Sequence, residues 1–210
     1  VANFQDWRDR SRVFSAIALA EPYGHELTGD GEPESYSSWL VTEQFFDVLG
    51  VRPMLGRAFE PQDFRRASDD RYLQGSSNVI ILGHALWRQR FGGDPGVIGR
   101  TVILRGRPML VVGVMPPESE LGDKDLLAPR VPSEADSKDR FANYRTVIAR
   151  LKPEVTVQIA SQEMRRIAAE LAREYPRSNR STGVLVNSYQ GEMFGAVRPA
   201  LLMLMGAVAF

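Results

Sequence analysis

The 210-residue sequence predicts an α+β fold. Short apolar runs bounded by glycine or proline predict strands. One long stretch, 156–175, carries apolar residues at helical spacing. Strands and helices alternate without the regular rhythm of βαβ units, which argues against a parallel α/β sheet. With 43% hydrophobic and 25% charged residues the composition is globular, and the length predicts one or two domains.

The first fifty residues predict two helices and two strands. A turn signal at 27–31 separates the strands, and Thr42 stands where it would N-cap the second helix, which Gly50 closes. The expected elements are a helix at 3–10, strands at 13–19 and 35–41, and a helix at 43–49.

The central part predicts a strand, a helix and a hairpin between two polar loops. The apolar run 110–112 does not alternate with polar residues, which predicts a strand covered on both faces. Gly106 marks the hairpin turn. The expected elements are an exposed loop at 65–71, a strand at 78–82, a helix at 84–91, strands at 101–104 and 108–115, and a loop or crossing at 118–140.

The last part predicts strands at 144–151 and 183–189 on either side of the helix at 156–175, which Pro176 stops. After Arg198 the chain carries no charge up to Phe210. Eleven helical residues rise about 16 Å, whereas the hydrocarbon of a bilayer is about 30 Å thick. The tail therefore fits either a C-terminal core helix or the beginning of a transmembrane helix, and composition leaves both open.

No residue pattern predicts catalysis, a cofactor or a metal. Twenty-six basic against 26 acidic residues argue against a nucleic-acid binder, and the absence of cysteine excludes thiol chemistry and cysteine metal sites. His25 and His84 have no metal-ligand spacing. The glycines of 92–99 follow a helix and lack the lysine of a phosphate loop, so they predict a turn. The acidic residues that remain as candidates lie in polar loops without an apolar pocket: Asp69, Asp70, Asp123 and Asp125.

Six short motifs occur in order along the chain. The motifs are Phe45–Pro53, Leu55–Phe59, Trp87–Pro95, Ile98–Arg100, Val111–Pro116 and Ala149–Pro153. With these motifs the sequence resembles, over about residues 4–210, the MacB-like periplasmic core domain of bacterial ABC-transporter permeases, of the acidobacterial macrolide-exporter-like type. A charged insert at 65–74 departs from the family pattern.

The resemblance implies a porter-like α/β subdomain, discontinuous in sequence, with an inserted smaller α/β subdomain. Residues 1–50 and 141–190 would form the first subdomain and residues 51–140 the second, with 196–210 the start of a truncated transmembrane helix. The motifs themselves suggest structural roles, with glycines in turns and aromatic residues in the core. No catalytic, cofactor-binding or metal residue is therefore transferred, and no cofactor is expected.

The resemblance also implies the function and the partners. The expected protein is a non-catalytic extracytoplasmic domain of a permease in the bacterial inner membrane, facing the periplasm and relaying ATP-driven conformational change to efflux or envelope processes. Its expected partners are the membrane, a second permease chain, a cytoplasmic ABC ATPase that hydrolyses the ATP, and a periplasmic adaptor whose engagement the sequence leaves open. Nucleic acid is not among them. The alternative is a free-standing soluble domain that binds a ligand or peptide.

Overall fold

The computed structural model describes residues 1–29, 31–65, 78–104, 106–117, 125–130, 134–141 and 146–188. The chain divides into two compact units. The first unit consists of residues 1–9 and 14–150, and the second of residues 10–13 and 151–210.

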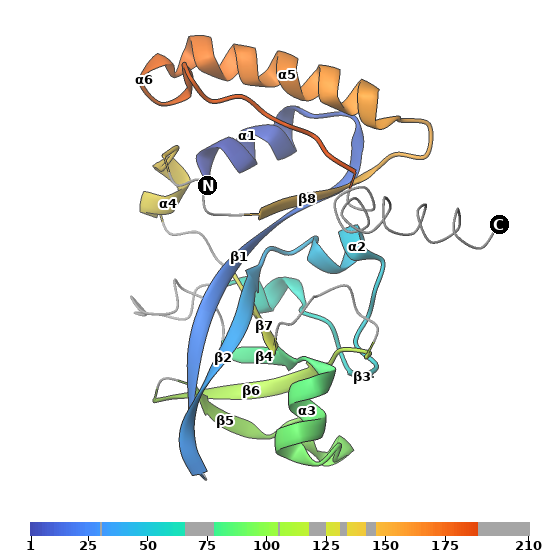
Figure 1. Ribbon diagram of the computed structural model, residues 1–210, viewed down its shortest axis with the longest axis vertical. Helices are drawn as coiled ribbons and strands as arrows, with labels where there is room; N and C mark the ends of the chain where they lie inside the picture. The colour runs from blue at the N-terminus through green and yellow to red at the C-terminus, as the bar shows by residue number, and fades with distance from the viewer. Residues whose placement is uncertain are drawn as a thin grey trace, which may run out of the picture. The chain divides into compact units, whose positions relative to one another are not determined.

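The elements of Figure 1 follow the predicted order for most of the chain. They are α1 (Ala2–Arg10), β1 (Phe14–Gly29), β2 (Gly31–Val41), α2 (Phe45–Leu49), β3 (Leu55–Gly56), the 3₁₀ helix η1 (Pro61–Phe64), β4 (Val79–Leu82), α3 (His84–Phe91), η2 (Pro95–Val97), β5 (Thr101–Leu104), β6 (Arg107–Val114), β7 (Leu126–Pro129), α4 (Glu134–Lys138), β8 (Thr146–Leu151), α5 (Val157–Glu174) and α6 (Pro176–Asn179).

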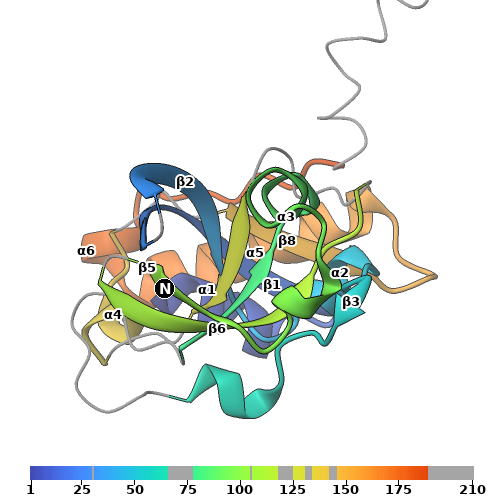
Figure 2. The same cartoon turned by 90° about the horizontal axis from the view of Figure 1, so that it is seen from below.

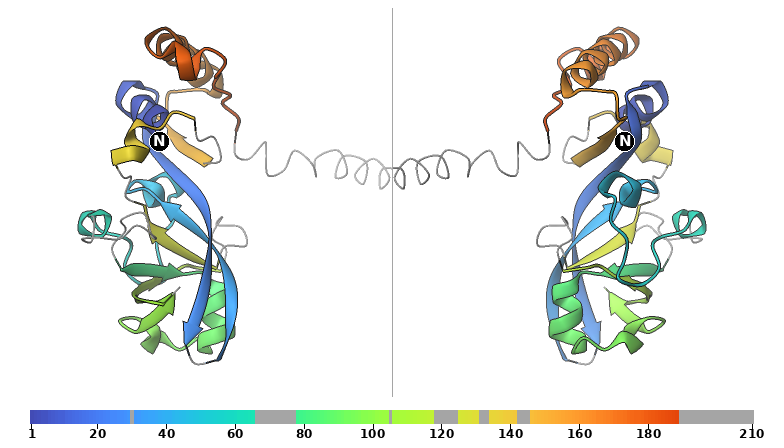
Figure 3. Two further views of the ribbon diagram at one scale, coloured as in Figure 1. Left: turned by 90° about the vertical axis from the view of Figure 1, so that its left-hand side faces the viewer. Right: turned by 90° about the vertical axis from the view of Figure 1, so that its right-hand side faces the viewer.

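One mixed sheet organises the first unit. In the described part of the chain its strand order is β2-β7-β4-β6-β5-β1-β8, with β3 paired to β6. Strands β2 and β7 run parallel, as do β4 and β6, and the other registered pairs are antiparallel. Because β1 also pairs with β2, the pairings return to their starting strand and close a ring. Figures 1 and 3 show β1 and β2 as a long twisted ribbon.

Helices cover both faces of the central strands, which explains the apolar runs without alternation. Ile80 and Leu82 of β4 pack with Leu86 and Trp87 of α3. The alternate residue Ile81 packs in a second cluster that contains the phenylalanines of α2. Successive side chains of a strand point to opposite faces, so a strand covered on both faces must be apolar throughout. The predicted two-sided burial of 110–112 is confirmed for Val111 and Val112, but Leu110 is 39% exposed. Figure 2 shows α3 beside these strands.

The motif glycines occupy turns and close contacts, as the sequence predicts. Gly50 ends α2 and Gly92 ends α3, both in the left-handed region. Gly56 also has positive φ, and a Cβ there would lie 2.1 Å from the carbonyl oxygen of Val112. Only glycine fits that approach. Arg150 donates to the carbonyl oxygen of Val48 at 2.9 Å, so two family motifs meet at the end of α2.

The motif arginine Arg57 is held by an acidic helix terminus. Its guanidinium donates to Asp63 of η1, whose carboxylate also accepts from the backbone nitrogen of Glu60 at 2.9 Å. The hydrogen bond to Asp63 raises the pKa of Arg57 above its ordinary value, although desolvation opposes the shift. Phe59, next in the same motif, is buried in the cluster that covers α2. This motif therefore serves packing.

Helix α5 dominates the second unit, and most of its predicted apolar stripe is confirmed. The Thr156 side chain accepts a hydrogen bond from the backbone nitrogen of Ile159 and caps the helix. Four residues of the predicted apolar stripe are buried: Ala160, Met164, Ile167 and Leu171. The fifth, Ala168, is partly buried, and Tyr175, just past the helix end, is 39% exposed. Pro176 begins the short α6.

Four sequence-based expectations are wrong. Thr42 does not cap α2, because its hydroxyl accepts from the backbone nitrogen of Leu19; the N-cap is Gln44. The polar stretch 118–140 contains a fully buried strand, β7, and the helix α4. Residues 183–188 form no strand. The first two strands reach Gly29 and Gly31 and are longer than predicted, since their backbones pair across the hairpin.

Some expectations stay predictions. The charged insert from residue 66 onward, Asp69, Asp70, Asp123 and the tail at 196–210 lie outside the described residues. The pairs β1–β5 and β2–β7 join strands of 1–50 to strands of 51–140. The subdomain boundaries at 50 and 140 stay a prediction.

Among the residues that the structure describes, none of the helices has the length and apolar character that crossing a membrane requires.

Candidate functional site

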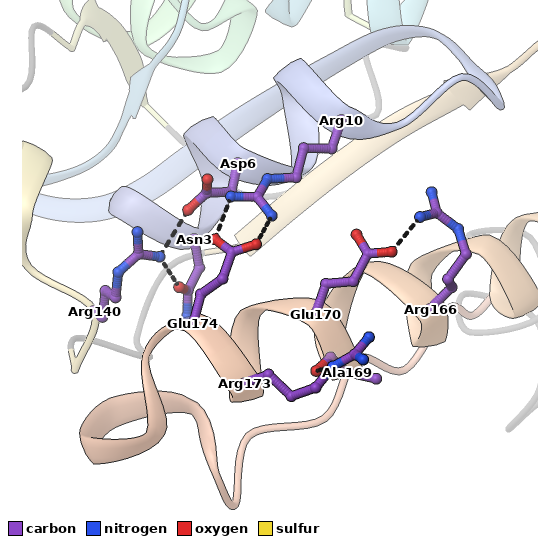
Figure 4. Close-up of polar contacts among 9 residues, drawn as sticks. All are labelled: Asn3, Asp6, Arg10, Arg140, Arg166, Ala169, Glu170, Arg173 and Glu174. Atoms are coloured by element: carbon purple, nitrogen blue, oxygen red, sulfur yellow. Dashed lines mark hydrogen bonds and ion pairs between the residues drawn. The ribbon is translucent and has the colours of Figure 1, made fainter.

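The first helix, α1, is fastened to the segment that follows α4. The backbone nitrogen of Ala2 donates to the carbonyl oxygen of Asp139 at 3.1 Å. The guanidinium of Arg140 donates to Asn3 at 2.6 Å and to Asp6 at 2.7 Å. Figure 4 shows Arg140 reaching both side chains of α1. We call these contacts of residues 2–6 with Asp139 and Arg140 the α1 clamp.

The ion pair of the α1 clamp is largely shielded from water. The side chains of Arg140 and Asp6 are 13% and 17% exposed. Exposed ion pairs contribute about 0–1 kcal/mol, whereas removing one partner of a buried pair costs several kcal/mol. By comparison, Lys138 and Glu134 of α4 form a pair that is 76% and 84% exposed. The α1 clamp therefore restrains α1 more strongly than a surface pair would.

A buried arginine continues this connection into the sheet. Arg130 directly follows β7, and its side chain is fully buried. Its Nε donates to Glu21 of β1, itself 5% exposed, and its NH2 lies 3.6 Å from Asp136 of α4. Its backbone nitrogen donates to Val41 of β2 at 2.8 Å. Arg130 thus ties α4 to the strands β1, β2 and β7.

In the second unit, α5 holds the residues that end and follow α1 in sequence. Arg10 donates through both terminal nitrogens to the carboxylate of Glu174, each at 2.7 Å. The backbone nitrogen of Arg12 donates to Glu163, and that of Lys152 donates to the carbonyl oxygen of Val13 at 3.0 Å. The bidentate geometry of Arg10 with Glu174 is visible in Figure 4. It fixes the orientation of the guanidinium as well as its distance from the carboxylate.

These contacts connect α1, the segment after α4 and the strands of the first unit. The groups that make them are arginines, carboxylates, an amide and backbone atoms. Sequence reasoning missed Arg130 and Arg140, because both lie in the stretch 118–140, for which the sequence predicts a polar loop or a crossing between subdomains. The available signal was the apolar run 126–129 immediately before Arg130.

Where the structure describes them, the residues that the sequence singled out make structural contacts. His84 lies at the start of α3 with its ring 5.5 Å from that of Trp87, which confirms a packing role. Asp125 accepts from the backbone and hydroxyl of Ser37. Gly92, Gly93 and Gly99 have positive φ, so the glycine cluster forms turns as predicted. Among the described residues, no three potential ligand side chains come close enough to hold a metal ion.

One open hollow of about 500 Å³ lies on the first unit. The residues that line it are Pro22, Tyr23, Gly24, Tyr36, Ser37, Ser38 and Asp125. Its polar groups are already engaged: besides Asp125 with Ser37, the Ser38 hydroxyl donates to the carbonyl oxygen of Tyr23 at 2.8 Å. The hollow therefore does not favour the alternative of a ligand-binding domain.

Solved structures share this fold. The periplasmic region of MacB from Actinobacillus actinomycetemcomitans matches with a TM-score of 0.58 and 17% identity, over 83% of this chain and 75% of that one. The extracellular domain of YknZ, a noncanonic ABC-type transporter from Gram-positive bacteria, matches with the same TM-score and identity, over 83% and 85% of the two chains. The fold is thus that of extracytoplasmic domains of ABC-type transporters.

The sequence comparisons define the family more narrowly. The chain belongs to the MacB-like periplasmic core domains, whose family model matches residues 2–167. The macrolide export ATP-binding/permease protein MacB of Neisseria gonorrhoeae is 26% identical over 177 residues, 80% of this chain and 24% of that protein. Its counterpart from Neisseria meningitidis is 30% identical over 117 residues, 54% of this chain and 17% of that protein. The chain thus spans about a quarter or less of the length of these relatives.

Proposed function

We propose that this chain is the extracytoplasmic domain of an inner-membrane ABC-transporter permease, and that it relays ATP-driven movement without catalysing a reaction. The α1 clamp, in a chain of the MacB-like family, is the observation that carries the proposal. ATP hydrolysis belongs to a separate nucleotide-binding domain or subunit. The domain faces the periplasm, and the relatives named as macrolide exporters support a role in efflux.

The proposed relay works through α1. A displacement of α1 is passed by the α1 clamp to Asp139 and Arg140. Helix α4 and the buried Arg130 then pass it to the strands. Packed interiors have low compressibility and transmit strain, so a displacement of the helix reaches the elements packed against it. Two permease chains pair in the proposed assembly, and a periplasmic adaptor is a further partner.

The test measures the movement of one labelled position in this domain. It uses the full-length permease, reconstituted with its ATPase. The 210 residues contain no cysteine, so Met54→Cys on the 47% exposed Met54 introduces a unique spin-label site in this domain. We expect the distance between the labels of two paired chains to change between the nucleotide-free and ATP-bound states. Identical distance distributions in the two states contradict the relay.

A variant of the α1 clamp distinguishes the relay from mere pairing of the two permease chains. Arg140→Ala removes the contacts to Asn3 and Asp6, and we expect it to reduce the ATP-dependent change while ATP binding persists. Lys138→Ala removes an exposed pair of the neighbouring helix and is the matched control. Circular dichroism of both variants verifies that the domain is folded. An Arg140→Ala protein that is folded and moves like the wild type contradicts the role of the α1 clamp.

A further inference from the structure

The outward side of α5 carries arginines and no acidic residue. Opposite the buried stripe, six exposed residues follow one another at helical spacing: Gln158, Gln162, Arg165, Arg166, Ala169 and Arg173. Arg177 in α6 and Arg180 just after it are also exposed. We call Arg165, Arg166, Arg173, Arg177 and Arg180 the basic surface.

The acidic residues of α5 leave most of the basic surface unneutralised. Glu163 accepts from the backbone of Arg12, and Glu174 binds Arg10. Glu170 pairs with Arg166 at 2.6 Å, and Figure 4 draws this ion pair as a dashed line. Arg165 donates to the Ser161 hydroxyl and Arg173 to the carbonyl oxygen of Ala169. Within the described part of the chain, four arginines of the basic surface therefore have no carboxylate partner: Arg165, Arg173, Arg177 and Arg180.

The charge of the second unit differs from that of the chain. The whole sequence is neutral, with 26 basic and 26 acidic residues. The described residues of the second unit, 10–13 and 151–188, contain eight basic and four acidic residues, a net charge of +4. A positive surface of this kind attracts an anionic partner within the range that salt leaves unscreened, about 8 Å at physiological ionic strength.

We propose that the basic surface binds the headgroups of anionic phospholipids at the bilayer surface. The inference rests on the proposed permease function, because the bilayer is then always within reach. Only 19 positions separate Arg180 from Pro199, where the apolar tail begins, and that length of chain spans at most about 65 Å. Arginine suits phosphate because its planar guanidinium donates two parallel hydrogen bonds.

The experiment measures partition of the full chain into vesicles. One set contains phosphatidylglycerol and phosphatidylethanolamine at a ratio of three to seven, and the other only phosphatidylcholine. An apolar tail adds to both partition coefficients, so their ratio isolates the contribution of charge. Each basic residue near an anionic surface contributes about fivefold. We therefore expect Arg165→Gln/Arg173→Gln to lower the anionic-to-neutral ratio about 25-fold, and 0.5 M salt to lower it for the wild type.

Matched variants test whether the lipid-binding site lies on the basic surface. Arg88→Gln/Arg100→Gln removes two exposed charges from the first unit and should change the ratio less than about twofold. Arg165→Lys/Arg173→Lys keeps the charge and should keep the preference, which distinguishes charge loss from unfolding. A wild type without preference for anionic vesicles, or equal losses in the glutamine variants of both units, overturns the proposal and favours an acidic protein as partner. The spin-label distances test the relay separately and do not depend on this result.

Discussion

At the residue scale, two glycines with similar backbone angles differ in what surrounds them. Gly56 (φ +71°) has the Val112 carbonyl oxygen 2.1 Å from where a Cβ would stand, whereas Gly106 (φ +75°) has nothing within 4 Å. Gly56→Ala combines left-handed strain with a backbone clash, and we expect it to cost about 3 kcal/mol or more of unfolding free energy. Gly106→Ala, which adds strain alone, should cost about 1–2 kcal/mol. Urea denaturation compares the two, and equal costs would contradict the role assigned to the Gly56 contact.

The buried arginine gives a second prediction at this scale. Arg130→Met leaves the carboxylate of Glu21 buried without its main cation, and we expect a loss of about 3–5 kcal/mol. In Arg130→Met/Glu21→Leu both charges are gone, so most of the loss should be recovered. A double-mutant cycle by chemical denaturation measures the coupling. If the double variant is less stable than either single variant, the pair does not act as the structure indicates.

At the element scale, α5 depends on its cap as well as on its apolar stripe. Thr156→Ala removes the acceptor for the backbone nitrogen of Ile159 and should cost about 1 kcal/mol. Thr156→Ser keeps the hydroxyl and should cost little, and thermal unfolding followed by circular dichroism measures both. A serine variant as unstable as the alanine variant would show that the methyl group of Thr156, rather than its hydrogen bond, stabilises the helix.

Helix α2 illustrates an element that its neighbours stabilise. It has five residues, too few for a helix to be stable in isolation. Phe45, Phe46 and Val48 are buried, and Arg150 binds the carbonyl oxygens at its end. The short helix is therefore held by packing and by a contact from a residue a hundred positions later in the sequence.

At the scale of the whole molecule, the apolar tail separates two interpretations. If Pro199–Phe210 begins a membrane helix, deleting it should leave the melting temperature nearly unchanged and improve solubility. If it is a core helix, its loss removes several buried side chains at about 2–5 kcal/mol each and should unfold a domain only about 5–15 kcal/mol stable. A thermal melt of the chain ending at Arg198 distinguishes the two. Loss of the cooperative transition would contradict the membrane interpretation.

The sequence by itself determined the elements whose signals are local. Helix α5 was predicted from its apolar spacing and Pro176, and α3 from the run between Gly83 and Gly92. The hairpin around Gly106 followed from a glycine between two apolar runs. In each of these elements the apolar run and the residue that ends it are neighbours in the sequence, so no distant partner is needed to specify the element. The ordered family motifs likewise identified the family, which the match over residues 2–167 confirms.

Only the tertiary structure decided which polar stretches are buried and which polar side chains meet. Strand β7 lies between charged residues in the sequence and becomes a strand because β2 and β4 pair with it on either side. Thr42 has the sequence of a cap, but its hydroxyl bonds to Leu19 in the neighbouring strand. The contacts of Arg130 with Glu21 and of Arg140 with Asp6 join residues 109 and 134 positions apart. Such contacts depend on how the strands pair, and local periodicity carries no information about that pairing.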